Sequence, residues 1–159
     1  MRTHTDLIAA GTVLELRKDN LVTYVQVVFD DPAFTLLVRV IPGVFDRSLS
    51  DTEMADRVAS SPDAALAWTF LRAEAMRTKA LVIAPRGMHP LPVGMAPEKL
   101  YRKPYPPEPG STTQRWQLCR PGGEKVIVSE PLSEKDARLP RGVARSYSEV
   151  LAIAEVPAD

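Results

Sequence analysis

Three apolar segments joined by very short connections dominate the first third of the chain. Residues 11–17, 21–29 and 34–41 are rich in Val and Leu. Such side chains fit a pleated surface, so each segment is predicted to be a strand. The connections at 19–20 and 30–33 are short, whereas a return to a parallel strand needs a dozen or more residues. The segments are therefore predicted to form an antiparallel meander.

The connections carry residues that favour turns. Residues 19–20 are Asp-Asn, whose short side chains can bond their own backbone and which tolerate a positive φ. Residues 30–33 are Asp-Asp-Pro-Ala, and their adjacent acids before a proline are interpreted as turn formers. Pro-Gly at 42–43 is predicted to end the third strand.

Helical signals follow the three strands. Ser50 and Glu53 match the capping box, in which each side chain bonds the backbone of the other residue, so a short helix is predicted over 51–60. Residues 64–78 are rich in Ala, Glu, Arg, Leu and Met, which favours a helix, although 68–71 could be a strand. Residues 81–83, Leu-Val-Ile, are predicted to be a strand.

Prolines are concentrated between residues 85 and 110, which hold eight of the fifteen in the chain. Proline lacks the N–H that a sheet needs, so this stretch cannot supply a central strand. It is predicted to wrap a single domain, residues 1–159, as an extended polyproline-like surface strap. The alternative is a linker between domains, but the short part of the chain that follows it would make a marginal domain alone.

The last part of the chain begins with a predicted hairpin of 115–119 and 124–129 around Pro-Gly-Gly. A single helical turn is predicted within 131–139, and an edge strand over 147–156. Trp68 and Trp116 are both predicted to lie in the core. The expected fold class is α+β and β-rich, either an antiparallel meander or a partly open SH3-like barrel with an inserted helix.

Cys119 is the only cysteine, which excludes an intramolecular disulfide and favours a reducing compartment. The apolar stretch at 7–10 is too short for a signal peptide. No apolar run approaches the ~18 residues that a membrane helix requires. The chain is therefore predicted to be cytoplasmic and to have no membrane partner.

Catalytic and metal-binding patterns are weak. His4 and His89 are far apart in the chain and have no ligand-like neighbours, so no metal site is predicted. Cys119 is interpreted as a buried structural residue. The pair Asp30 and Asp31 lacks a local histidine or lysine to tune it. No phosphate-cradling or nucleophile motif occurs, so neither an enzyme nor a cofactor is expected. An enzyme built around Asp30, His89 or Cys119 is the weakest alternative.

The charges balance, with 20 Lys and Arg against 20 Asp and Glu, which argues against a dedicated nucleic-acid or membrane-surface protein. Their distribution is uneven. Residues 28–66 hold seven acids against three bases, and residues 86–145 hold eleven bases against six acids. If folding separates these stretches, the acidic one could steer a basic partner, although a set of solvated turns is an equally good reading. The candidate partner-binding residues are Asp30, Asp31, Asp46, Asp51, Glu53 and Asp56.

Short motifs in the C-terminal third include Leu-Tyr-Arg at 100–102, Gln-Arg-Trp-Gln-Leu at 114–118, Pro-Leu-Ser at 131–133 and Val-Leu at 150–151. Together with the first hairpin, led by Gly11, they resemble immunity proteins of bacterial polymorphic-toxin systems, in particular small β-rich families with a late Trp strand. The resemblance implies a cytosolic, non-catalytic protein that binds and neutralises a cognate toxin. It also implies that 68–75 is a strand. It transfers no contact residues, because these vary with the toxin.

Two functions of different classes follow from these observations. The first is a toxin-neutralising protein whose acidic 30–63 region contacts a basic, nuclease-like toxin. The second is a small nucleic-acid-binding β-barrel, for which phosphate contacts would fall on a set of basic residues: Lys99, Arg102, Lys103, Arg115 and Arg120.

Overall fold

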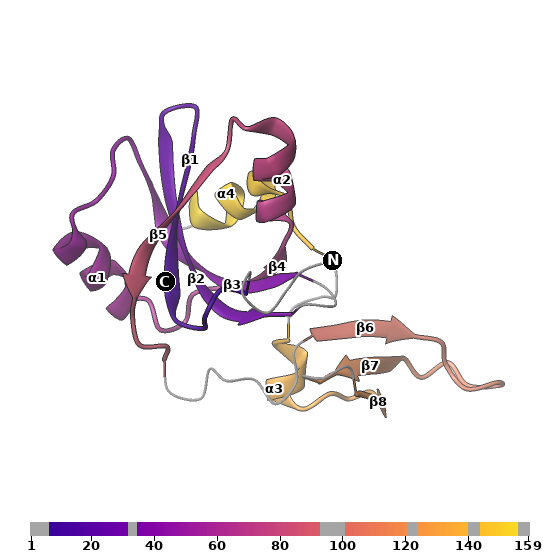
Figure 1. The fold of residues 1–159 in the computed structure, drawn as a ribbon. Helices are drawn as coiled ribbons and strands as arrows, with labels where there is room; N and C mark the ends of the chain where they lie inside the picture. Colours follow the sequence, from indigo (N-terminus) through magenta and orange to yellow (C-terminus); the bar gives the residue numbers. More distant parts are fainter. Residues whose placement is uncertain (1–6, 32–34, 93–100, 121–123, 140–143, 156–159) are drawn as a thin grey trace. The chain divides into compact units, whose positions relative to one another are not determined.

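The computed structural model describes residues 7–31, 35–92, 101–120, 124–139 and 144–155 (Figure 1). The chain divides into two compact units. The first unit comprises Met1–Met95 and Ala144–Asp159, and the second comprises Ala96–Val143. The predicted single domain over 1–159 stays a prediction beside this division.

The first unit is built on a five-stranded antiparallel sheet with the order β4-β3-β2-β1-β5. Its strands are β1 (Thr12–Lys18), β2 (Leu21–Asp30), β3 (Leu36–Phe45), β4 (Leu66–Thr69) and β5 (Val82–Met88). The predicted meander of the first three strands is confirmed. Asp19 and Asn20 join β1 to β2, and both have a positive φ. This left-handed pair is what a tight two-residue hairpin requires.

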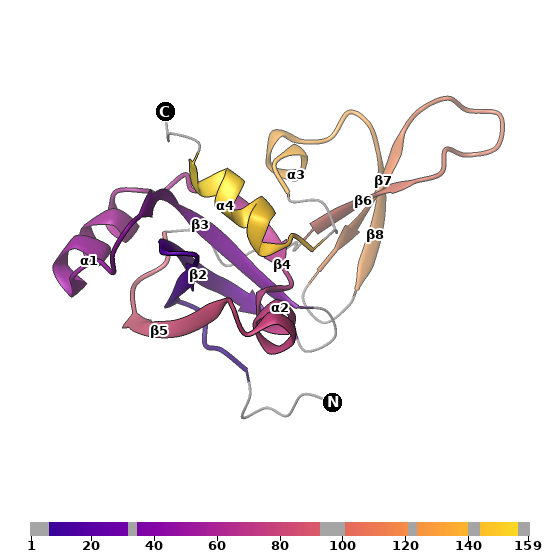
Figure 2. The same cartoon turned by 90° about the horizontal axis from the view of Figure 1, so that it is seen from above.

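Side chains alternate between two buried faces of this sheet. Leu14, Leu16 and Val25 belong to a cluster that also contains residues of α2 (Leu71–Thr78) and α4 (Tyr147–Glu155). Figure 2 shows α4 lying across β3. On the other face, Val13, Tyr24 and Ile41 pack with Met54 and Val58 of α1 (Asp51–Ala59). Helices therefore cover both faces, and polar residues of the central strands are buried as well.

Three local predictions need correction. Pro42 and Gly43 do not end β3, because the strand continues to Phe45 through an irregularity in its pairing with β2. Residues 64–78 are split between β4 and α2. The predicted edge strand at 147–156 is the helix α4, which buries Tyr147, Val150 and Ala154, a spacing that places them on one helical face.

The second unit is a three-stranded antiparallel sheet with the order β6-β7-β8. It comprises β6 (Tyr101–Tyr105), β7 (Arg115–Cys119) and β8 (Lys125–Ser129), followed by the short helix α3 (Glu134–Ala137). The β7–β8 hairpin and the helical turn are confirmed, and residues 121–123 and 140–143 lie outside the described part. Trp116 is 7% exposed and Trp68 is 0% exposed, so both tryptophans are buried as predicted.

The proline-rich stretch supplies edge strands where a strap was predicted. Pro85 lies in β5 and Pro104 in β6, and both strands are at the edge of their sheets. Within its described residues, the stretch 85–110 supplies no central strand, as expected, because an edge strand leaves one side of its backbone unpaired and tolerates proline there. Residues 93–100 lie outside the described part.

The fold is α+β and β-rich, with antiparallel sheets throughout, as the sequence predicted. Among the described residues, no helix is both long enough and apolar enough to cross a membrane.

Candidate functional site

A buried carboxylate organises one face of the first unit. Glu15 of β1 is 3% exposed. Its Oε1 accepts hydrogen bonds from the Tyr24 hydroxyl at 2.7 Å and from Arg86 Nη1 at 2.6 Å. Its Oε2 accepts from Ser48 Oγ at 3.0 Å and lies 3.3 Å from Arg17 Nε. Strands β1, β2 and β5 and the segment after β3 therefore meet at one side chain.

The same network holds the main chain in front of α1. The Leu49 N–H donates to the Tyr24 hydroxyl at 2.8 Å. Arg86 Nη2 donates to the Leu49 carbonyl at 2.8 Å and to the Asp51 carboxylate at 2.9 Å. Side chains of the sheet, from Glu15, Tyr24 and Arg86, thus fix the segment 48–51.

Burial and hydrogen bonding act in opposite directions on Glu15. Burial raises the pKa of its carboxyl, but hydrogen bonds from Tyr24, Ser48 and Arg86 together outweigh burial and hold that pKa below its ordinary value. Burial, and then the hydrogen bond to Glu15, raise the pKa of Tyr24. At neutral pH the pair is an ionised carboxylate and a protonated phenol. This arrangement suits a structural role more than proton exchange.

Helix α1 is fixed at both ends. At its start, Ser50 and Glu53 form the predicted capping box, and Arg47 donates to both oxygens of Glu53 at 3.1 and 2.8 Å. The hydrogen bond from Arg47, followed by those from Ser50, lowers the pKa of Glu53 to about 2. At the end of α1, the buried Arg39 of β3 donates to the carbonyls of Val58 and Ser61.

Arg39 is held in turn by its strand neighbour. Its Nε donates to Gln26 Oε1 at 2.7 Å, and both side chains are 0% exposed. Gln26 Nε2 donates to the His89 carbonyl at 2.8 Å. A cation at a helix C-terminus meets the negative end of the helix dipole. Two polar cross-strand sets, centred on Glu15 and on Arg39, therefore support α1 and the segment that leads into it.

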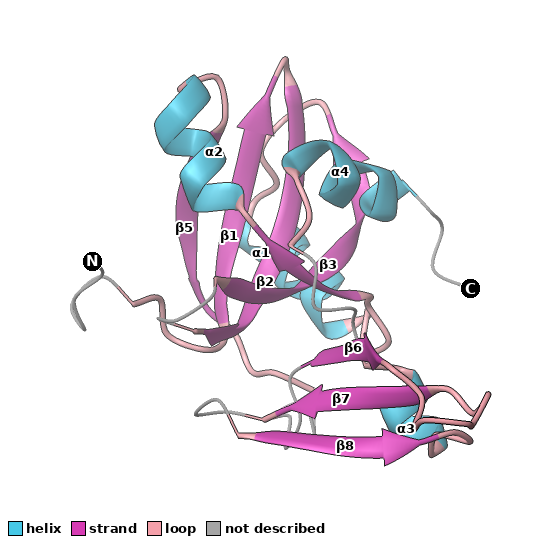
Figure 3. Cartoon of the chain, turned by 90° about the vertical axis from the view of Figure 1, so that its right-hand side faces the viewer, coloured by secondary structure: helices cyan, strands magenta, loops and turns pink. Residues whose placement is uncertain are grey.

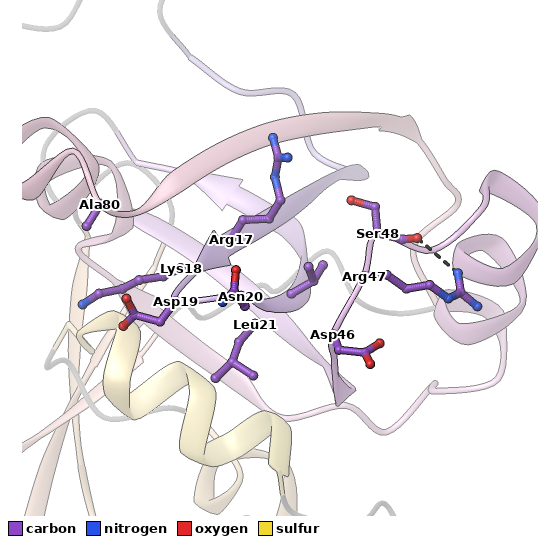
Figure 4. A pocket seen from close by; sticks show the side chains of 10 residues that line it. Arg17, Lys18, Asp19, Asn20, Leu21, Asp46, Arg47, Ser48 and Ala80 are labelled. Carbon is purple, nitrogen blue, oxygen red and sulfur yellow. Dashed lines mark hydrogen bonds between the residues drawn. The ribbon is translucent and has the colours of Figure 1, made fainter.

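Two hollows flank this supported segment. One, of about 360 Å³, lies between the β1–β2 turn and residues 46–48 (Figure 4). The other, of about 500 Å³, is lined by residues of β3, α1 and the segment between them: Phe45, Arg47, Leu49, Glu53, Asp56, Arg57 and Ser60. We call residues 45–60 the α1 surface. Arg47 lines both hollows.

Four of the six predicted partner-binding acids lie on the α1 surface: Asp46, Asp51, Glu53 and Asp56. Asp46 and Asp56 are exposed and form no ion pair with any other described residue. Asp51 pairs with Arg86 at 2.9 Å, and Glu53 pairs with Arg47 at 2.8 Å. Half of the acids gathered here are thus already matched by a cation of the same unit.

The other two predicted acids lie at the far end of the sheet. Val22 pairs with Phe45 at one end of the β2–β3 ladder, and Asp30 pairs with Leu36 at the opposite end. The Asp30 carboxylate accepts from Arg72 Nη2 at 2.9 Å and from the Ile8 N–H at 2.8 Å. Asp31 is half-buried beside it. The six residues therefore do not form one continuous patch.

The alternative candidates are also placed. Arg102 stacks over the Trp116 ring, Arg115 stacks over the Tyr105 ring, and Arg120 pairs with Glu124. Lys103 is exposed, and Lys99 lies outside the described residues. Among the nucleophile and ligand candidates, Cys119 is buried, and the main chain of His89 bonds Gly11 and Gln26. No metal-binding group of three or more ligand residues occurs in the part of the chain that the structure describes.

Sequence reasoning missed the residues that organise the α1 surface: Glu15, Tyr24, Gln26, Arg39 and Arg86. The available signal was the presence of polar side chains inside otherwise apolar strands, such as Glu15 between Leu14 and Leu16. The chain matches no protein-family model, no curated protein and no solved structure.

Proposed function

We propose that the chain is a non-catalytic binding protein that neutralises a basic protein toxin by direct contact through the α1 surface. The observation that carries the proposal is the fixed main chain of residues 48–51, which lies in the sequence between two exposed acids. Asp46 lines the smaller hollow and Asp56 lines the larger one. A surface that is ordered before it meets its partner loses less entropy on binding.

The chemistry of the α1 surface suits a cationic partner. The first unit carries fourteen Asp and Glu against eleven Lys and Arg. Asp46 and Asp56 have no ion-pair partner among the described residues, so they are the acids best placed to meet a lysine or arginine of the partner. Complementary charge at a rim raises the association rate and disfavours wrong partners.

An aromatic residue supplies an apolar contact on the same surface. Phe45 lines the larger hollow, and the Arg57 guanidinium lies 5.0 Å from the centre of its ring. Aromatic side chains and arginine are the residue types most enriched among those that dominate binding energy. The assignment of a toxin as the partner comes from the resemblance to immunity proteins, which also supports a cytoplasmic location.

The test begins with the open reading frame next to the gene of this chain. Its product is expressed alone and then together with the full-length chain, and growth is measured. The proposal expects toxicity that co-expression relieves, and a 1:1 complex of the purified proteins in titration calorimetry. A toxic neighbour that is neither relieved nor bound by the chain refutes the proposal.

Charge reversal then tests the surface. The double variant Asp46→Lys and Asp56→Lys is expected to weaken the complex at least tenfold and to reduce its salt sensitivity. The matched control is Asp63→Lys with Glu155→Lys, which changes the net charge equally at two other exposed positions of the first unit. Equal weakening by both doubles means that overall charge, and not the α1 surface, decides binding.

A further inference from the structure

The sheet of the second unit has two unlike faces. Arg102, Trp116 and Leu118 share one face, where Trp116 is 7% exposed and Leu118 is 0% exposed. Arg102 stacks 4.5 Å from the Trp116 ring centre and donates to the carbonyl of Leu139, two residues beyond the end of α3. The segment that contains α3 therefore covers this face, and Figure 3 shows α3 behind β7 and β8.

The opposite face carries aromatic and basic side chains. Strand alternation and the observed register place on it Tyr101, Lys103, Tyr105, Arg115, Gln117, Lys125 and Ile127. We call this set the open face. Lys103 and Lys125 are exposed, and Ile127 is 44% exposed. Cys119 ends β7 on the same side of the sheet but is buried, so it offers no contact.

A cation lies over each tyrosine ring of the open face. Lys103 Nζ is 5.5 Å from the centre of the Tyr101 ring, and the Arg115 guanidinium is 5.1 Å from that of Tyr105. The two tyrosines are four residues apart on β6, which corresponds to roughly 13 Å along a strand. A flat ring can stack on a base of any identity, and a neighbouring cation can contact the phosphate that follows.

The charge of the second unit is complementary to a polyanion. Residues 96–143 contain nine Lys and Arg against six Asp and Glu, although the whole chain is neutral. An acidic protein segment would satisfy the cations, but it offers no flat aromatic group that could stack on a tyrosine ring. The combination of both features favours a nucleic acid with unpaired bases.

We propose that the open face binds single-stranded nucleic acid. Bases stack on Tyr101 and Tyr105, and phosphates contact Lys103, Arg115 and Lys125. The inference goes beyond the proposed function, because it assigns a second ligand to the second unit. It also revises the basic set expected from the sequence. Arg102 belongs to the covered face, and Arg120 follows the end of β7 and is not part of the open face. Arg115 stays in the set and also lies 3.7 Å from the exposed Glu108.

The first experiment titrates the full chain into a fluorescein-labelled 15-nucleotide oligo(dT) and follows the anisotropy at about 50 mM salt. Saturable binding at roughly micromolar concentration is expected, as for sequence-independent binders. Three phosphate contacts predict a plot of log K against log salt with a slope of about −2, because each contact on a single strand contributes about −0.7.

Two pairs of variants locate the site. Tyr105→Leu removes a stacking ring and is expected to weaken binding about 5- to 150-fold, whereas Tyr105→Phe keeps the ring and the affinity. Lys103→Glu is expected to weaken binding and to flatten the salt slope. Lys135→Glu, an equal charge change at an exposed position of α3, is expected to leave both unchanged. Circular dichroism verifies that each variant is folded.

Four results overturn the inference. They are the absence of binding at about 50 mM salt, equal affinities of Tyr105→Leu and the unsubstituted chain, equal weakening by Lys103→Glu and Lys135→Glu, and competition by poly-glutamate as effective as competition by unlabelled oligo(dT). The last result identifies an acidic polypeptide as the occupant of the open face.

Discussion

Replacing Glu15 with Gln tests whether the buried carboxylate holds the first unit together. The amide has nearly the same shape and can still accept from Tyr24 or Arg86, but it removes the charge from three hydrogen bonds donated by Tyr24, Ser48 and Arg86. A hydrogen bond to a charged group contributes about 1 kcal/mol more than a neutral one.

The expected loss in the free energy of unfolding is therefore about 2–3 kcal/mol. This loss is smaller than the largest losses measured when one partner of a buried ion pair is removed. The reason is that the Arg86 side chain is 19% exposed and keeps its hydrogen bonds to Leu49 and Asp51. For a unit of this size, the loss corresponds to a decrease in the melting temperature of about 10 °C. Urea and thermal unfolding at pH 7, followed by circular dichroism, measure both quantities.

Glu53→Gln is the matched control. Glu53 pairs with Arg47 at the surface, and glutamine also serves in a capping box, so little change in stability is expected. The pH dependence adds a second check. Because the folded pKa of Glu15 is lowered, its contribution is complete above its unfolded pKa of about 4.3 and is lost as the pH falls through the folded value. The stability gap between the unsubstituted chain and Glu15→Gln should narrow over that range. Equal effects of Glu15→Gln and Glu53→Gln at pH 7 refute the reasoning.

Three further substitutions test the supports around this network. Arg39→Lys is expected to destabilise the first unit by about 2 kcal/mol in urea unfolding, because one ammonium group cannot reach the three acceptors of the guanidinium; the exposed Arg57→Lys is the control. Gly43→Ala should cost about 1–3 kcal/mol more than Gly87→Ala. Both glycines have positive φ, but only at Gly43 does the added Cβ meet a neighbour, the Phe45 ring at 2.7 Å. Ser146→Ala should lower stability by about 1 kcal/mol through loss of the α4 cap, whereas Ser148→Ala, exposed within the same helix, should not; equal effects would contradict the capping role.

Local signals in the sequence predicted the elements that depend on local chemistry. The meander follows from strand-forming residues and very short turns, and α1 follows from the capping box at Ser50 and Glu53. The same pattern occurs at Ser146 and Glu149, where each side chain bonds the backbone of the other residue. There the β-branched residues of 147–156 favour a strand, and the prediction of an edge strand is wrong.

The candidate site was less predictable because it depends on register and on coverage of the sheet. Glu15 alternates with Leu14 and Leu16, which suggests a polar residue on a solvated face. That face is covered by α1, so Glu15 is buried and needs partners. Its partner Arg86 lies 71 residues later in the chain, on the strand beside β1. No local pattern links the two residues.

The distribution of charge shows why net charge was a poor guide to binding. The neutral chain consists of a first unit with three excess acids and a second unit with three excess bases. Even within the first unit, Asp30, Asp51 and Glu53 are matched by arginines of that unit, so the sum over a stretch of sequence overstates the acidity that a partner meets. Screening limits exposed charges to about 8 Å at physiological salt. A partner of the α1 surface therefore responds to Asp46 and Asp56, and a ligand of the open face responds to Lys103 and Lys125.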